Sequence, residues 1–210
     1  APGSQNVFYA VTTDEPYLPP SNGLRYSVVD ISLAGGNGSV TVKNQLLDSL
    51  AGEQVAAVRH CNGSDYWIVS RRHNTNVFLT YLLSSSGLNT VAVQSAVGPV
   101  VQWPSHLKIS PSGQRLAFGH WETASFALYN FDNSTGIITS YCKLPVTDSS
   151  FALASGIEFS PDGSKLYGAA DSTLFQWSLC ASTDSILRAS KDSIPLGSYQ
   201  GLLQLAINGK

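Results

Sequence analysis

The chain has 210 residues and a formal net charge of −2, with 12% charged and 43% hydrophobic residues. This charge argues against a nucleic-acid partner, because phosphate binding needs clustered Lys and Arg. No run of 18 apolar residues predicts a membrane span. The many Ser, Thr, Gly, Asn and aromatic residues, with no methionine, favour an all-β domain cut from a secreted precursor.

Three strands are predicted in the N-terminal part of the chain. Pro2-Gly3 reads as a turn, and alternating apolar and polar residues follow over 6–12, 24–32 and 40–47. A first strand before this turn is missing. The segment therefore reads as an incomplete sheet.

A turn phrase then recurs along the chain. Asn62-Gly63 opens the pattern, Ser110-Pro111-Ser112-Gly113 repeats it, and Ser160-Pro161-Asp162-Gly163 repeats it again, with the glycines 50 residues apart. Around the second copy, strands are predicted over 107–110, 115–119, 126–131 and 137–144. A fixed period of about 50 residues built from short strands and turns is typical of β-propeller blades.

The sequence therefore predicts an all-β fold, a β-propeller with four-stranded antiparallel blades, three of them complete and partial blades at both ends. We treat the chain as one domain, because each blade contacts only its neighbours. The predicted segments are roughly 1–50, 51–101, 102–150, 151–198 and 199–210, the last supplying one first strand over 202–208.

Three arrangements fit the incomplete ends. Strand 202–208 closes a four-bladed ring by pairing with 6–12, or the chain is a piece of a propeller of about six to eight blades. We favour the larger ring, because four-bladed propellers are less common. In the third arrangement two chains associate through their open blade edges.

The cysteines and histidines give no sign of a metal site or of catalysis. Cys61, Cys142 and Cys180 match no metal motif, and we read them as buried small hydrophobes, with a Cys142–Cys180 bridge as the alternative. His106 and His120 fall in one blade, where structural hydrogen bonding is the favoured role. We predict no catalytic residue, no metal and no cofactor.

Four stretches of the chain carry a family resemblance: 22–30, 57–67, 129–136 and 156–168. They resemble the WD-like propeller region of large secreted or surface proteins of gliding bacteria, which continue into PKD repeats and end in a type IX secretion sorting domain. The resemblance implies a secreted or cell-surface location and blades beyond both ends of this chain. It implies no catalytic residues.

The leading functional hypothesis is a non-enzymatic binding or scaffold module that presents loops to a protein or glycan partner. Exposed aromatics can stack on sugar rings, so Tyr17, Trp103 and Trp121 are the first candidates for binding. Trp67 and Trp177 lie within strand patterns and are assigned to the blade cores.

Polar residues complete the candidate binding set. They are His120, beside Trp121, and the basic pair Arg71-Arg72, which with His73 and Arg59 reads as a solvated loop.

Two alternatives stay open. The first is a propeller enzyme of lactonase, lyase or glycosidase type, whose site gathers residues from several blades and leaves no linear motif. The predicted innermost strands offer Lys108, Glu158 and Gln204 for it. The second is a structural spacer in a long adhesin.

Overall fold

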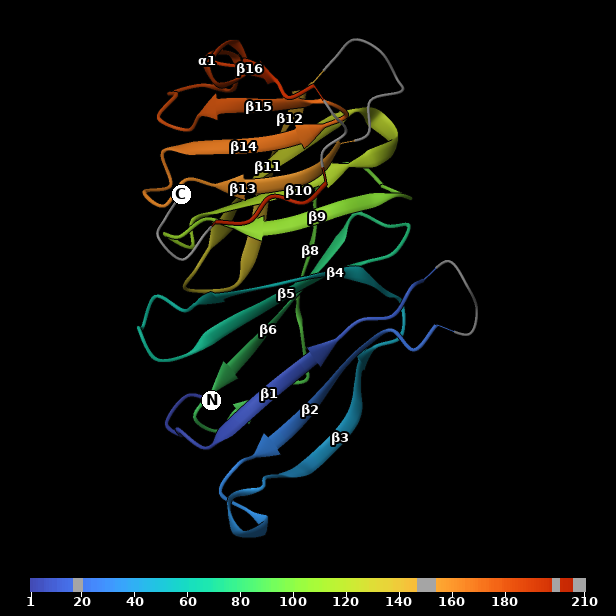
Figure 1. Cartoon of the computed structure of the whole chain (residues 1–210), viewed down its shortest axis with the longest axis vertical. Coiled ribbons are helices and arrows are strands. Elements are labelled where there is room, and N and C mark those ends of the chain that lie inside the picture. Colours follow the sequence, from blue (N-terminus) through green and yellow to red (C-terminus); the bar gives the residue numbers. More distant parts are fainter. Residues whose placement is uncertain (17–20, 147–153, 198–200, 206–210) are drawn as a thin grey trace. The chain divides into compact units, whose positions relative to one another are not determined.

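The computed structural model describes residues 1–16, 21–146, 154–197 and 201–205. These ranges contain four antiparallel sheets (Figure 1), and each sheet falls within one of the first four predicted segments. The chain divides into two compact units. The first comprises Ala1–Ala96 and Asn133–Ile137, and the second comprises Val97–Asp132 and Ile138–Lys210.

The first unit holds a three-stranded and a five-stranded sheet. The three-stranded sheet has the order β1-β2-β3, as the N-terminal strand pattern predicted. In the other sheet, β8 pairs with β6 in addition to the path β4-β5-β6-β7. The strands are Val7–Thr12 (β1), Leu24–Asp30 (β2), Ser39–Asp48 (β3), Ala51–Arg59 (β4), Tyr66–Arg72 (β5), Val77–Ser84 (β6), Gly87–Leu88 (β7) and Val93–Ala96 (β8), with the short helix Ala34–Gly36 (η1) between β2 and β3.

The core of the first unit is built from the inward faces of these strands. Leu24, Ile68 and Leu79 are among its buried members, and Tyr9 packs against them. Trp67 is 4% exposed, which confirms its assignment to a core. Its indole Nε1 donates to the carbonyl of Asn133 at 2.9 Å, so the turn 133–137 belongs to this unit although β11 and β12 on either side belong to the other.

The second unit holds two four-stranded sheets with the orders β12-β11-β10-β9 and β13-β14-β15-β16. Both confirm the prediction of four-stranded antiparallel sheets. Their elements are Pro104–Ile109 (β9), Arg115–His120 (β10), Trp121–Thr123 (η2), Ser125–Asp132 (β11), Ile137–Pro145 (β12), Ala154–Phe159 (β13), Lys165–Ala170 (β14), Thr173–Ser178 (β15), Asp184–Ala189 (α1) and Asp192–Pro195 (β16).

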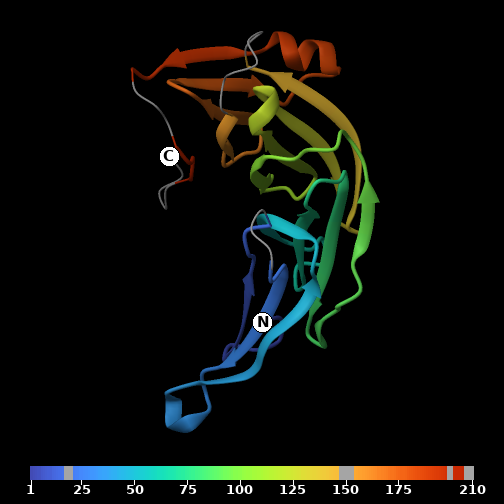
Figure 2. The same ribbon diagram turned by 90° about the vertical axis from the view of Figure 1, so that its right-hand side faces the viewer.

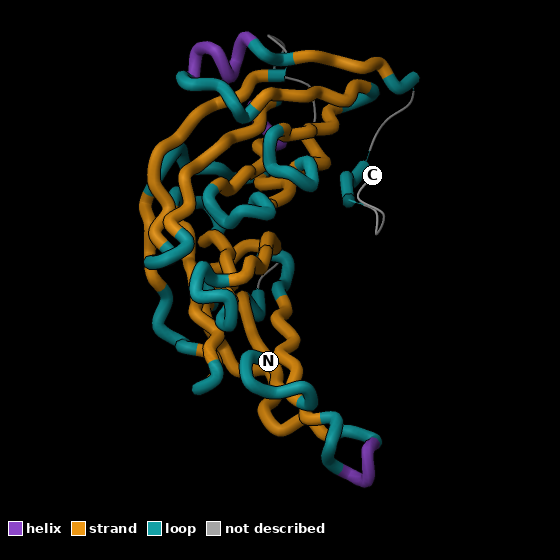
Figure 3. The backbone as a smooth tube through the Cα atoms, turned by 90° about the vertical axis from the view of Figure 1, so that its left-hand side faces the viewer, coloured by secondary structure: helices purple, strands orange, loops and turns teal. Residues whose placement is uncertain are grey.

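Helix is sparse, as Figure 3 shows, and α1 was not predicted from the sequence. It connects β15 to β16 (Figure 2), where a simple strand connection was expected. The Thr183 side chain caps it by accepting from Ile186 N at 3.3 Å. In the described part of the chain, no helix has the length and apolar character to cross a membrane.

The repeated turn phrase has the same geometry in both sheets of the second unit. The amide of Gly113 donates to the carbonyl of Ser110 at 2.8 Å, and that of Gly163 donates to Ser160 at 2.9 Å. Both glycines have a positive φ, 67° and 70°, which glycine adopts without the penalty that a side chain would impose. The spacing of the glycines thus marks equivalent hairpins.

The degenerate copy folds in the same way in the first unit. Gly63 N donates to His60 O at 2.9 Å, and His60 N donates to Asp65 O at 2.8 Å. The second bond is equivalent to the bonds from Ser110 N to Arg115 O and from Ser160 N to Lys165 O. The prediction of a third repeat at this place is confirmed.

The core of the second unit lies between its two sheets. The rings of Phe126 and Trp177, both fully buried, meet edge to face with centroids 5.8 Å apart. Burial of Trp177 confirms its assignment to a core. The Phe126 ring reaches so close to β14 that a Cβ at Gly168 would lie 2.3 Å from its Cε2 atom.

Replacing Gly168 with alanine is therefore expected to lower the free energy of unfolding by about 1–3 kcal/mol, because the methyl group overpacks the contact with Phe126. Chemical denaturation measures the change. The matched control is Gly201→Ala, where an added Cβ meets nothing within 4 Å. Equal stability of the two variants would contradict this packing.

The Asp162 carboxylate locks the second of the two turns. Its Oδ1 accepts from Ser160 Oγ at 2.6 Å and from Ser164 N at 3.0 Å, and these hydrogen bonds lower its pKa to about 2 from the ordinary 3.8. A depressed folded-state pKa stabilises the fold above the unfolded value and loses that contribution as the pH falls. Ser112 takes the place of Asp162 in the other turn and faces Ser110 Oγ at 3.1 Å.

We expect Asp162→Asn to reduce stability at neutral pH and to flatten its dependence on pH between about 4 and about 2, the window in which the folded-state carboxylate alone stays ionised. Thermal unfolding at a series of pH values tests this. Ser112→Asp, at the equivalent position, should gain the same dependence. An unchanged acid profile in Asp162→Asn would refute the assignment.

The C-terminal segment lies along β13. Gly156 has no room for a side chain, since a Cβ there would stand 2.6 Å from Gly201 O and 2.8 Å from Leu203 N. Further along, Leu205 N donates to Glu158 Oε2 at 3.4 Å. Residues 201–205 are not assigned to a strand and 206–208 lie outside the described residues, so the first strand over 202–208 stays a prediction.

Candidate functional site

Two of the aromatic candidates lie next to each other in the backbone. Trp103 precedes β9 and Trp121 follows β10, and Trp121 N donates to Trp103 O at 3.1 Å. Their side chains are 38% and 42% exposed. The third aromatic candidate, Tyr17, lies outside the described residues.

His120 is in the interior. It ends β10 with 1% of its surface exposed, and its ring lies 5.4 Å from that of Phe118 and 6.4 Å from that of Tyr141. The sequence placed it just beyond the strand. Because the strand continues through His120, its side chain packs among aromatic rings and is not presented by a loop.

Arg71 is also buried, which corrects its interpretation as part of a solvated loop. It lies within β5 and is 2% exposed. Its guanidinium donates to the carbonyl of Thr75 at 2.5 Å and stands 5.3 Å from the ring centre of Phe78. The strand extends through both arginines, so these contacts replace solvent.

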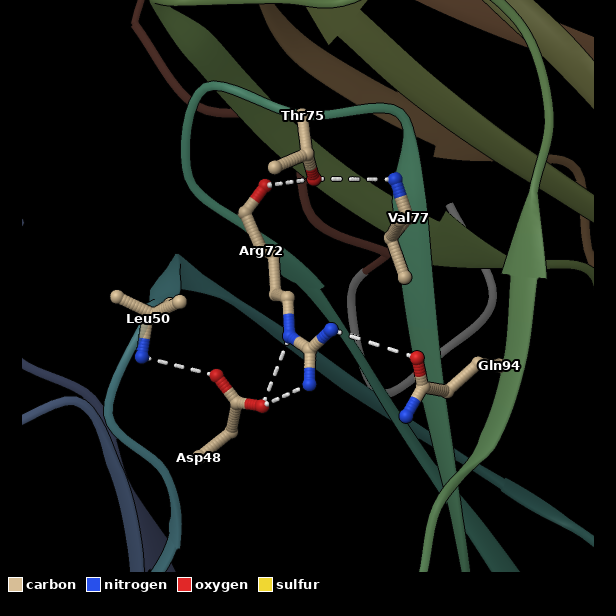
Figure 4. A network of polar contacts seen from close by, with 6 residues as sticks. All are labelled: Asp48, Leu50, Arg72, Thr75, Val77 and Gln94. Atoms are coloured by element: carbon tan, nitrogen blue, oxygen red, sulfur yellow. Dashed lines mark hydrogen bonds and ion pairs between the residues drawn. The ribbon is translucent and has the colours of Figure 1, made fainter.

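Arg72 holds a polar network together (Figure 4). Its Nε and Nη2 each lie 2.9 Å from Asp48 Oδ2, and its Nη1 donates to Gln94 Oε1 at 3.3 Å. Asp48 also accepts from Leu50 N at 2.9 Å. The network connects the β3–β4 junction to β5 and β8. With burial, Asp48 raises the pKa of Tyr81 to about 12.

Arg72→Met should lower the free energy of unfolding by roughly 1–3 kcal/mol, because it leaves the nearly buried Asp48 carboxylate without its cation. This range lies between the losses typical of exposed and of buried ion pairs. Urea denaturation measures the loss. The control is Lys43→Met, an exposed residue of β3. Similar losses in both variants would show that the pair contributes nothing specific.

The structure brings together charged residues that the sequence set aside as too few for catalysis. Lys108 in β9 and Glu158 in β13 occupy equivalent positions in successive repeats, and Lys108 Nζ lies 2.7 Å from Glu158 Oε2. Their side chains keep 32% and 17% of their surface exposed. β9 and β13 each form one edge of their sheet, so the ion pair joins the edge strands of neighbouring sheets.

His106 lies two residues before Lys108 in β9, in the stretch where the pairing with β10 shifts register between Leu107 and Pro104. Burial lowers its pKa below the ordinary 6.5, and the Lys108 ammonium lowers it further. At neutral pH the imidazole is therefore uncharged and has a nitrogen that can accept a proton. The sequence favoured a structural role for this histidine, because the burial and the nearby cation that lower its pKa depend on the fold.

A hollow of about 250 Å³ adjoins Glu158. Tyr167, paired with Glu158 across β13 and β14, lines it together with Leu174 and the C-terminal residues Leu203, Gln204 and Leu205. Of the three inner-strand candidates, Lys108 and Glu158 are in direct contact and Gln204 lies at this hollow. The signal for the Lys108–Glu158 pair in the sequence was their separation by one repeat.

The cysteines differ in their surroundings. Cys142 is buried, as predicted, but Cys61 and Cys180 are exposed, which corrects their interpretation as buried hydrophobes. All three are unbridged, so the alternative of a Cys142–Cys180 bridge is wrong. In the described part of the chain, no three His, Cys, Asp or Glu side chains gather closely enough to hold a metal ion.

The chemistry available at β9 and β13 follows from the side chains of His106, Lys108 and Glu158. A neutral imidazole can accept a proton from water, an ammonium group can stabilise a developing oxyanion, and a carboxylate can hold the ammonium in place. The hollow is lined by Glu158 together with apolar residues, among them Phe159, Leu174 and Leu203. Such a set fits hydrolysis of a carbonyl compound.

Comparison with known proteins shows the fold class. A Bacteroides fragilis protein assigned as a 6-phosphogluconolactonase superposes with a TM-score of 0.64 at 9% identity, over 99% of this chain and 60% of its own. The periplasmic gluconolactonase PpgL of Pseudomonas aeruginosa gives 0.63 at 14% identity, over 97% and 60%. The Cps50 (Swd1) β-propeller domain of Myceliophteria thermophila gives 0.55 at 11%, over 85% and 55%.

The fold is of the propeller type. No family model matches the chain, and no curated protein matches it. The chain spans about 60% of the length of the first two structures, so the number of blades in the whole protein stays a proposal.

The comparisons also correct the leading functional hypothesis. Lactonases recur among the similar structures, which favours the enzyme alternative over a non-enzymatic binding or scaffold module. The binding hypothesis rested on exposed aromatics and on the thin set of inner-strand residues. The sequence alone could not show that Lys108 and Glu158, 50 positions apart, form an ion pair.

Proposed function

We propose that this chain is part of a β-propeller enzyme that hydrolyses sugar lactones. The observation that carries the proposal is the group of His106, Lys108 and Glu158 on adjacent edge strands. The similar structures that are lactonases support the choice of substrate. Because their identities to this chain are low, the roles below rest on the geometry of this chain.

In the proposed reaction, His106 accepts a proton from water as the water oxygen attacks the lactone carbonyl carbon. Lys108 stabilises the negative charge that develops on the carbonyl oxygen. The bond from the carbonyl carbon to the ring oxygen then breaks, and the leaving oxygen takes the proton from His106. The product is an open-chain hydroxy acid. Glu158 is a positioning residue that holds the Lys108 ammonium at 2.7 Å.

Trp103 and Trp121 would contact the sugar in this proposal. They flank the paired ends of β9 and β10, and β9 also carries His106. Half-exposed indoles offer a flat apolar surface to the C–H face of a sugar ring. The stacking of aromatic side chains on a sugar, suggested by the sequence, would thus contribute to binding of the lactone substrate.

We also propose that the four sheets are blades of a larger propeller. The support is the 60% share of the lactonase-like structures that the chain spans. Export to the cell surface, and the resemblance to gliding-bacterial surface proteins that implies it, stay predictions. Fractionating cells and detecting the native polypeptide with an antibody would test the location and the size together.

The direct test is hydrolysis of glucono-δ-lactone and of 6-phosphogluconolactone by the purified chain, with the spontaneous rate subtracted. His106→Ala is expected to lower kcat about 100-fold or more through loss of the general base. The wild-type rate should fall on the acid side only below the ordinary histidine pKa of 6.5, because burial and Lys108 lower the pKa of His106.

Two further variants separate the roles. Glu158→Gln should reduce kcat less than Lys108→Met, since the glutamine can still contact the ammonium group. The matched control is Lys143→Gln, an exposed residue of β12, with wild-type rates expected. Wild-type rates no faster than the spontaneous reaction, or an unaffected His106→Ala, would overturn the proposal.

A further inference from the structure

A second, smaller pocket lies in the second unit, away from the inner strands. It has a volume of about 190 Å³. Strands β10, β11 and β12 form one wall, and the loop leading into α1 forms the other. Its polar lining includes Arg115, Asn130, Ser140, Ser182, Thr183 and Asp184.

The strand wall is a hydrogen-bonded chain of three side chains. Arg115 Nη1 donates to Asn130 Oδ1, and Asn130 Nδ2 donates to Ser140 Oγ at 3.1 Å. Ser140 has a φ of 59°, a left-handed backbone conformation that costs a serine free energy. The chain fixes the guanidinium and leaves the Ser140 hydroxyl proton to donate.

The opposite wall comes from the segment that the sequence did not predict as helical. Thr183 Oγ1 accepts from Ile186 N at 3.3 Å, so its hydroxyl proton is also available. Asp184 is close enough to Cys142 to affect the pKa of its thiol, Arg188 Nη1 donates to Cys142 Sγ at 3.6 Å, and the thiol faces Lys143 O at 3.9 Å. Burial, and after it Asp184, raises the pKa of Cys142, so the thiol stays neutral.

One cation, Arg115, and one carboxylate, Asp184, line the pocket, so binding of an anion there depends on Arg115 being unpaired. Among the described residues, no carboxylate lies within ion-pair distance of Arg115, and the two ion pairs found there involve other residues. Most of its N–H donors therefore remain for a ligand. A guanidinium matches a carboxylate with two parallel hydrogen bonds, and serine and threonine hydroxyls match hydroxyl groups.

We propose that this pocket binds a small hydroxycarboxylate anion, with its carboxylate on Arg115 and its hydroxyl groups between Ser140 and Thr183. The volume holds about six waters at about 30 Å³ each, which fits a molecule of the size of glycerate. The site is separate from the inner-strand group and independent of the proposed lactone hydrolysis.

The test is isothermal titration calorimetry of the full chain with sodium D-glycerate, and separately with glycerol and with inorganic phosphate. Saturable binding of glycerate is expected, with no binding of glycerol and weaker binding of phosphate. Arg115→Gln should weaken glycerate binding about tenfold or more, and Ser140→Ala about two- to tenfold. Circular dichroism and thermal unfolding establish that both variants are folded.

Lys143→Gln, which removes an exposed cation near the pocket but outside its lining, serves as the matched control and should bind glycerate like the wild type. The proposal is overturned by absence of saturable glycerate binding, by equal binding of glycerol or phosphate, or by an Arg115→Gln variant that is folded and binds normally. The proposal is also overturned if the amide signals of residues 140 and 182–184 in ¹⁵N spectra do not shift when glycerate is added.

Discussion

The repeated hairpin turn is the constraint on which the remaining geometry depends. Its two backbone hydrogen bonds, from residue 63, 113 or 163 to the carbonyl three residues earlier and from residue 60, 110 or 160 to the carbonyl five residues later, fix the phase of each sheet. Because side chains alternate along a strand, a slip of one residue would reverse every inward position. With the phase fixed, Lys108 and Glu158 occupy equivalent places and can meet.

Much of the fold could be predicted from local signals. Glycines with a positive φ and alternating strands located the hairpins, and the strands of the third segment differ from the predicted ones by a few residues only. α1 was missed because six residues are too few for a helical period to emerge. The C-terminal strand was predicted from the repeat spacing, and the structure adds that Gly156 lets residues 201–203 approach β13 closely.

The candidate site was harder to predict, because its contacts join residues far apart in the sequence. Arg71 and Arg72 read as a solvated loop, yet the partner of Arg72 is Asp48, 24 residues earlier, and Arg71 finds a carbonyl and an aromatic ring. His106 gave no signal of its own, since burial sets its proton affinity and burial depends on the fold. Exposed tryptophans were correctly placed in connections, but their neighbours were not foreseeable.

The first unit is discontinuous along the chain, and this has consequences for any attempt to divide the protein. The turn 133–137 supplies the carbonyl that accepts from the Trp67 indole, and Asn133 Nδ2 donates to Arg59 O at 3.0 Å. A fragment ending at residue 96 would lose both partners, leaving the buried indole without its acceptor. Cleavage of the chain between β8 and β9 would thus separate the first unit from residues 133–137, which complete it. Such interlacing favours unfolding of the whole chain as one cooperative event.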